Sequence, residues 1–258
     1  MELNLTLPQG NFILKNSAEK EDFNENKSKS NGIIGKVIIG LVIVLVIAAA
    51  GGRKPELSWF KKAACGRKIY CADRGIEICF DAGFRPELLC GDADSTAPAY
   101  LQKAKDEKIK ALLFNPAKDD TDLQLLLNNL PLKNNLLITG IWGGRFDHLY
   151  SNVFSLCSYK KMTNTAVIMA DEHELMVLLA AGESLEFTAG VDFQALSLIP
   201  LENSCVSLSG TRWPLKKAEL LTSYPYAISN EIISEVVKLS CHSGFAGFYL
   251  KTASKELL

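Results

Sequence analysis

The chain has 258 residues, of which 48% are hydrophobic and 22% charged, so it can fold as one large globular domain or two smaller ones. Its formal net charge of −1 lacks the basic excess that binding to a phosphate backbone requires, and we expect no nucleic-acid partner. Seven cysteines form an odd set without CxxC or CxxH spacing, which argues against a zinc site and a disulfide scaffold. The sequence therefore predicts reduced cysteines and a cytoplasmic protein.

Two unlike segments open the chain. Residues 1–36 are predicted to form a disordered tail, because residues 1–32 are polar and rich in Asn, Lys, Glu and Ser. Sixteen uncharged, apolar residues follow at 37–52. This run is short for a membrane helix, which needs about 20 such residues. Its β-branched part, Val42–Ile47, favours a buried first strand. We therefore expect membrane contact only if residues 37–52 span a bilayer. In that case the basic residues that follow them would place the remainder of the chain in the cytoplasm.

Apolar runs then alternate with helical patterns, which is typical of an α/β domain with an open parallel sheet. This nucleotide-binding domain is predicted at 37–166. Short alternating runs broken by Gly, Pro and Asn follow, and they predict a smaller all-β sandwich domain at 167–258. The strands expected in the first domain lie within 44–52, 68–75, 86–95, 109–116 and 134–140, and the helices within 55–65, 76–83, from 98 onwards, 119–130 and 146–160.

Aspartates follow four of the predicted strands, where the carboxyl ends of parallel strands form a ligand crevice. Asp92 and Asp94 are two residues apart, so both side chains point the same way in an extended segment. Asp119 and Asp122 are three apart at a predicted helix start, which places them on one face. Any single aspartate is more commonly a helix cap or a turn residue. Four acidic sites at successive strand ends instead indicate one shared site, formed by Asp73, Asp92, Asp94, Asp119, Asp120, Asp122 and Asp147.

Gathered carboxylates predict a hard divalent cation, which prefers oxygen ligands. Magnesium takes one or two carboxylates plus substrate phosphates, so the expected ligand is a nucleotide di- or triphosphate. Arg145, Lys118 and the amides beside Gly143 and Gly144 would complement the phosphate charge. The sequence has no P-loop and no GxGxxG, which argues against a P-loop kinase and a dinucleotide enzyme. His148 is interpreted as a scaffold residue.

These residues lie in motifs that resemble those of the thiamine pyrophosphokinase family over about residues 42–250. The resemblance implies an α/β nucleotide domain followed by a β-sandwich, and usually a homodimer. It also implies transfer of the pyrophosphoryl group of ATP to thiamine with Mg²⁺, which gives thiamine diphosphate and AMP. The motifs are ADRG (72–75), GDADS (91–95), KDDTD (118–122), GGRFDH (143–148) with Asn152, SLIPL (197–201), GTRWPL (210–215) and SNE (229–231).

The resemblance also implies roles for individual residues. The acceptor hydroxyl of thiamine needs a carboxylate or a metal to take its proton, and this base is expected among Asp92, Asp94 and Asp122. Trp213 offers a flat face to a cationic aromatic ligand, at a site that the family builds at its dimer interface. The implied sets are Asp92, Asp94, Asp119 and Asp122 for the metal; Asp92, Asp94, Asp122, Arg145 and Asp147 for catalysis; Asp73, Gly75, Ser95, Lys118, Thr121, Gly143 and Gly144 for the nucleotide; and Trp213, Ser229 and Asn230 for thiamine.

The chain departs from the family pattern at residues 73–77, where the common sequence is DGGAN. Arg74 replaces a glycine at which the backbone approaches the nucleotide, and Glu77 adds negative charge near the phosphates. These changes leave an alternative open, a catalytically weak thiamine- or nucleotide-binding protein of the same fold.

Overall fold

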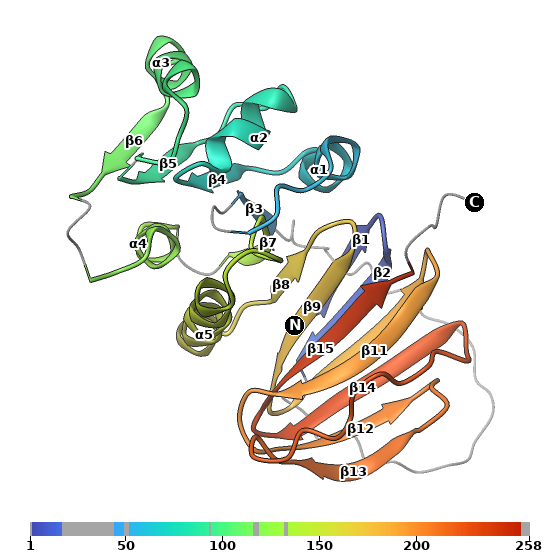
Figure 1. Cartoon of the computed structure of the whole chain (residues 1–258). Coiled ribbons are helices and arrows are strands. Elements are labelled where there is room, and N and C mark those ends of the chain that lie inside the picture. Colours follow the sequence, from blue (N-terminus) through green and yellow to red (C-terminus); the bar gives the residue numbers. More distant parts are fainter. Residues whose placement is uncertain are drawn as a thin grey trace, which may run out of the picture.

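The computed structural model describes residues 2–16, 44–48, 52–92, 94–115, 119–131 and 134–253. These residues form two β-sheets, one of which is flanked by helices (Figure 1). The predicted α/β architecture with a β-rich second half is confirmed. The helices are α1 (Leu57–Ala64), α2 (Gly75–Asp81), α3 (Pro98–Asp106), α4 (Asp122–Asn128) and α5 (Phe146–Thr163).

The larger sheet has nine strands in the order β11-β15-β9-β8-β7-β3-β4-β5-β6. The six strands from β8 to β6 pair in parallel, and β9, β15 and β11 extend the sheet with antiparallel pairing. The strands are β3 (Val44–Ala48), β4 (Ile69–Ala72), β5 (Leu88–Gly91), β6 (Lys110–Leu113), β7 (Asn135–Thr139), β8 (Val167–Ala170), β9 (Glu174–Ala180), β11 (Phe193–Pro200) and β15 (Phe245–Thr252).

Local sequence signals explain where the helices begin and how they pack. Pro98 occupies the first turn of α3, where its missing N–H costs nothing. Thr121 caps α4 in a capping box with Gln124. Leucines of α4 and apolar residues of α5 pack on one face of the parallel strands, whereas buried residues of α1, α2 and α3 belong to the core on the other face. Each strand and helix predicted for the first domain has a counterpart among the described residues, although α4 begins at Asp122 rather than at 119.

The smaller sheet is antiparallel, in the order β1-β2-β10-β14-β12-β13. It packs against the β9-β15-β11 part of the larger sheet, and the rings of Phe187 and Phe248 meet edge to face at 6.1 Å between the two. Together these strands make the predicted sandwich. The strands of the smaller sheet are β1 (Glu2–Leu7), β2 (Gly10–Asn16), β10 (Glu183–Ala189), β12 (Ser204–Ser209), β13 (Leu215–Leu220) and β14 (Val236–Ser243).

The prediction of a disordered N-terminal tail is wrong for residues 2–16. They form the hairpin β1–β2, and β2 pairs with β10 along the full length of both strands. Leu3, Leu5 and Leu7 alternate with exposed residues and are buried in the sandwich core. This period of two was hidden by the polar composition of the longer segment. Residues 17–36 lie outside the described residues.

The apolar run at 37–52 contributes strand β3, which pairs in parallel with β4 and β7 at the centre of the larger sheet. The favoured interpretation of the run as a strand is thus confirmed for 44–48, in which Val46 and Ile47 are buried, and residues 37–43 and 49–51 lie outside the described part. Among the residues that the structure describes, no helix is long and apolar enough to span a bilayer.

The boundary predicted at 166/167 falls within the larger sheet. β8, the first strand after it, pairs in parallel with β7 and antiparallel with β9. One continuous sheet therefore joins the helix-covered half of the chain to the sandwich.

All seven cysteines are free thiols that differ in exposure. Burial raises the pKa of Cys157 to about 12 and that of Cys241 to about 11, so neither forms the reactive thiolate near neutral pH. We expect a thiol reagent at pH 8 to label exposed Cys65 first and partly exposed Cys205 more slowly. Cys157 and Cys241 should react only in denaturant. Mass spectrometry of the labelled peptides checks this order, and rapid native labelling of Cys157 would contradict the packing of α5.

Candidate active site

Residues 52–53, after β3, meet residues 140–142, after β7, at the carboxyl end of the larger sheet. The Gly52 N–H donates to the Gly140 carbonyl at 3.0 Å, and the Arg53 N–H donates to the Trp142 carbonyl at 2.5 Å. β3 has β4 on one side and β7 on the other, so the strand order reverses here. In open α/β sheets the ligand crevice lies at such a switch point.

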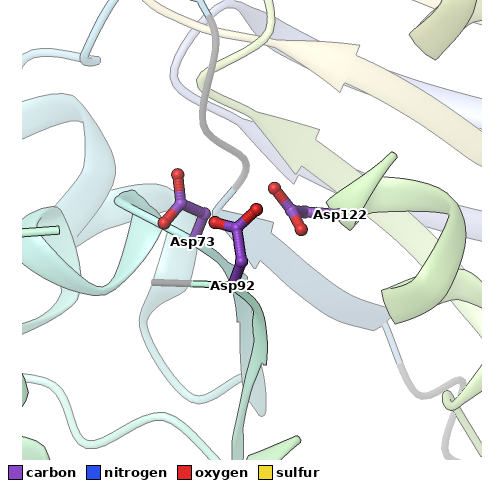
Figure 2. Close-up of side chains that lie close together, drawn as sticks. All are labelled: Asp73, Asp92 and Asp122. Atoms are coloured by element: carbon purple, nitrogen blue, oxygen red, sulfur yellow. The ribbon is translucent and has the colours of Figure 1, made fainter. Parts of the chain in front are cut away.

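Three aspartates gather beside this point. Asp73 follows β4, Asp92 follows β5 and Asp122 opens α4. Each offers a carboxylate oxygen, and these oxygens all lie within 4.8 Å of one another. Figure 2 shows the three side chains close together, with Asp92 between Asp73 and Asp122. The ends of β4 and β5 and the start of α4 thus bring three acids together, and we call this set the three-acid cluster.

Two residues in and beside the cluster, Asp73 and Gly91, have a positive φ. Asp73 is buried and takes a left-handed conformation, with φ +44°. Its carboxylate accepts hydrogen bonds from the hydroxyls of Ser95 and Thr96. Gly91 has φ +147°, and a Cβ there would lie 3.1 Å from an Asp122 carboxylate oxygen and 3.2 Å from the Asp73 nitrogen. A larger residue at position 91 would therefore disturb two members of the cluster.

The cluster fits a small hard cation. Its donors are carboxylate oxygens, the ligand type that Mg²⁺ prefers. Three like charges at this separation repel one another, and a divalent cation would offset that repulsion. Because Gly91 has no side chain, the space next to Asp73 and Asp122 stays open.

Two predicted metal ligands lie outside the cluster. The Asp92 carboxylate accepts the Asp94 N–H at 3.2 Å, so these two residues are not the pair of parallel side chains that we expected from an extended segment. Asp94 is exposed, and hydrogen bonding to Asp92 together with nearby negative charge raises the pKa of Asp94. Asp119 is also exposed and precedes α4, which begins at Asp122, so the expected shared helix face does not exist.

Arg145 and Asp147 pair with each other at the start of α5. Two hydrogen bonds, of 3.1 and 2.5 Å, join the guanidinium to the carboxylate, and both side chains are exposed. Bonding to Arg145 lowers the pKa of Asp147. Asp147 is not a member of the three-acid cluster. Gly143 and Gly144 have φ +69° and +73°, and a left-handed backbone of this kind favours glycine.

The other predicted nucleotide contacts have varied surroundings. Ser95 orients Asp73, as described above. Thr121 accepts the Gln124 N–H at 3.3 Å as the cap of α4, so its hydroxyl has a structural partner. Gly75 is buried at the first position of α2. Lys118 lies outside the described residues.

The two residues that depart from the family pattern, Arg74 and Glu77, lie at a pocket of about 240 Å³ between residues 52–55 and the start of α2. Arg74, Gly75 and Glu77 help to line it. Glu77 accepts the Ala97 N–H at 3.1 Å, so its carboxylate is engaged at the start of α3. A larger hollow of about 320 Å³ lies between α4 and α5, and none of the clustered acids lines it.

Sequence reasoning missed Arg53, which also lines the smaller pocket. Partial burial opposes its charge, but hydrogen bonds to Asp171 and the charges of Asp171 and Glu174 outweigh this and raise the pKa of Arg53. The available signal was its position directly after Gly51 and Gly52 at a strand end. Its partners are 118 or more residues away, so no local pattern could have revealed them.

The three predicted thiamine residues lie in two connections of the sandwich: Trp213 follows β12, and Ser229 and Asn230 lie between β13 and β14, where Asn230 pairs with Leu196 of β11. Trp213 is 54% exposed, and its backbone is clamped by Asn230, which accepts the Trp213 N–H at 3.1 Å and donates to its carbonyl at 2.7 Å. Ser229 has φ +61°, and its N–H donates to the Ser197 hydroxyl at 3.0 Å. β12 and β13 lie at the opposite end of the molecule from β4 and β5 (Figure 1).

Comparison with known proteins gives a consistent result. The family model "Thiamin pyrophosphokinase, catalytic domain" matches residues 62–169, and "Thiamin pyrophosphokinase, vitamin B1 binding domain" matches residues 184–246. Together they match about two thirds of the chain.

Individual relatives agree with these matches. The chain is 28% identical over 165 residues to thiamine pyrophosphokinase from Bacillus subtilis, which covers 62% of this chain and 76% of the relative. It is 28% identical over 169 residues to thiamin pyrophosphokinase 1 from Caenorhabditis elegans, which covers 61% and 67%. The crystal structure of the Bacillus subtilis protein superposes with a TM-score of 0.69 at 25% identity and covers 81% of this chain and 99% of that one.

Proposed function

Because the chain belongs to the thiamine pyrophosphokinase family, we propose that it transfers the pyrophosphoryl group of ATP to the hydroxyl of thiamine, giving thiamine diphosphate and AMP. The observation that supports this most directly is the three-acid cluster at the strand ends. Pyrophosphoryl transfer needs charge neutralisation and positioning rather than covalent chemistry from the protein.

We propose that Asp92 and Asp122 hold Mg²⁺ with Asp73, which Ser95 and Thr96 keep in place. When bound, the ion would neutralise charge that develops on the phosphate oxygens. Asp94 is exposed beside the cluster, so its carboxylate is available to accept the proton of the thiamine hydroxyl.

The loop at 143–147 is proposed to bind phosphate. Left-handed Gly143 and Gly144 let the backbone approach a ligand closely. The exposed pair of Arg145 and Asp147 is screened by water, so the guanidinium can exchange its carboxylate partner for a phosphate oxygen. Asp147 would thus pair with Arg145 while no phosphate is bound.

We propose that thiamine binds against Trp213 and that the active form is a homodimer. Within one chain, the strands that flank Trp213 lie far from the acid cluster, so a second copy would have to bring the two together. Exposed apolar side chains near Trp213 in the sequence support such an interface: Tyr224, Tyr226, Ile228 and Ile233. Light scattering after gel filtration tests the dimer. We also propose a cytosolic location, supported by seven free thiols.

Release of AMP tests the proposed activity. Purified protein should form AMP only when ATP, thiamine and Mg²⁺ are all present, and product analysis should show thiamine diphosphate. Folded protein that binds thiamine or nucleotide but forms no AMP would instead favour the catalytically weak alternative.

Replacing Trp213 by alanine is expected to raise the KM for thiamine about fivefold and to change the KM for ATP less than about twofold, because an aromatic face contributes on the order of 1 kcal/mol to binding a cationic ring. Trp213→Phe keeps an aromatic face and should show a smaller effect. Steady-state kinetics with each substrate varied in turn measures both constants. Equal changes in the two KM values would remove the assignment of Trp213 to thiamine.

A further inference from the structure

Arg53 connects three separate segments next to the proposed phosphate loop. Its backbone N–H donates to the Trp142 carbonyl at 2.5 Å, directly before Gly143. A Cβ at Gly143 would lie 3.4 Å from the Arg53 Cβ and 3.5 Å from its Nη1. The arginine therefore packs against the turn of the loop that carries Arg145.

The guanidinium is anchored on the opposite side by a buried acid. Its Nε and Nη2 donate to the same Asp171 oxygen at 3.1 and 2.5 Å, and Nη2 lies 3.5 Å from Glu174. Asp171 is fully buried, and its second oxygen accepts the N–H groups of His173 and Glu174 at 2.8 and 2.9 Å. Because both oxygens have partners, the anchor has little freedom to rotate.

The N-terminal hairpin also contacts Asp171, the residue that anchors the Arg53 guanidinium. Gln9, at the β1–β2 turn, is 2% exposed, and its side-chain amide donates to the Asp171 carbonyl. The hairpin precedes residue 62, where the family match begins. The anchor of Arg53 thus rests partly on a segment outside the matched regions.

We propose that Arg53 is a positioning residue that fixes the loop at 141–147 through its contacts with Trp142, Gly143 and Asp171. Arg53 would not touch the reacting atoms. It holds the turn in which Gly143 and Gly144 adopt left-handed conformations, and so sets where Arg145 meets the phosphate. The kinetic consequence rests on the proposed function, whereas the effect on the loop does not.

Hydrogen exchange tests the effect on the loop without any substrate. In Arg53→Gln, the amides of residues 141–147 should exchange at least about tenfold faster than in the wild type, since local opening sets their protection. Arg53→Lys keeps a charge beside Asp171, which protects the fold, and should give a smaller increase. Arg85→Gln is the matched control, because Arg85 also anchors a loop, through the Glu107 and Lys108 carbonyls at 3.0 and 3.2 Å. Unchanged exchange at 141–147 in both Arg53 variants would overturn the proposal.

Kinetics test whether the loop transmits the effect. Arg53→Gln should lower kcat by about tenfold to a hundredfold, as expected for a small displacement of a catalytic group, with little change in the KM for thiamine. Arg85→Gln should stay within about twofold. In an Arg145→Lys background, Arg53→Gln should add less than about threefold, because both changes act through one loop.

The outcomes separate the two proposals. Effects that multiply in the double variant would overturn a role for Arg53 through Arg145. A wild type that forms no AMP would defeat the proposed function, yet faster exchange at 141–147 confined to the Arg53 variants would still support the positioning role.

Discussion

Replacing Asp92 by asparagine is expected to lower kcat by about a thousandfold, the loss that follows removal of one preorganised charge-stabilising group from an active site. Asp92 shares the three-acid cluster with Asp73 and Asp122. Asparagine keeps the size of the side chain and one oxygen, but it removes a negative charge that would hold the cation. The change therefore tests the charge of the cluster rather than its shape.

Stability should change in the opposite sense from activity. Three carboxylates within 4.8 Å repel one another in the absence of a cation, so Asp92→Asn should leave the melting temperature unchanged or raise it when no Mg²⁺ is present. Added Mg²⁺ should stabilise the wild type and have a smaller effect on the variant. Thermal melts with and without Mg²⁺, alongside the AMP assay, measure both effects.

Asp106→Asn provides a matched control. Asp106 is exposed at the end of α3, where it accepts a hydrogen bond from Gln102 at 2.8 Å, and its replacement should change neither kcat nor the response to Mg²⁺. Near-normal turnover in Asp92→Asn would show that the three-acid cluster is not the metal site.

Local patterns predicted the elements that bring the acids together. Each buried strand reads as an apolar run, and Asp73 and Asp92 follow directly because parallel strands end at one edge. Side-chain direction after the strand was not predictable, since it depends on the turn. The Asp92 carboxylate accepts the Asp94 N–H and α4 begins only at Asp122, and neither Asp94 nor Asp119 belongs to the three-acid cluster.

Contacts between distant segments were also beyond sequence reasoning. Arg53 reaches Asp171 across 118 residues, and β2 finds its partner β10 more than 160 residues later in the chain. Such pairings depend on the packed tertiary structure and leave no mark at a fixed spacing. The hairpin itself did carry a local signal, the alternation of Leu3, Leu5 and Leu7, which average composition concealed.

The largest loss of stability is expected from Lys160→Ala, about 3–5 kcal/mol in the free energy of unfolding, because it leaves a buried charge without its partner. The Lys160 ammonium lies 2.8 Å from Glu183 and donates to the Thr165 carbonyl at 3.0 Å, and its side chain is only 1% exposed. Glu183 also accepts the Ala180 N–H at 2.9 Å. This ion pair ties the last turns of α5, the helix that follows the proposed phosphate loop, to strand β10 of the sandwich.

Two further variants separate burial from charge in this ion pair. Lys161 is paired with Glu202 on the surface, about half exposed, so Lys161→Ala should cost less than about 1 kcal/mol. Lys160→Met with Glu183→Gln removes both charges while retaining most of the volume, and should recover most of the loss caused by Lys160→Ala. Urea unfolding of the three variants measures these differences. An equal loss of unfolding free energy in Lys160→Ala and Lys161→Ala would contradict this prediction. It would mean that water reaches Glu183 and that α5 and β10 do not pack tightly around the ion pair.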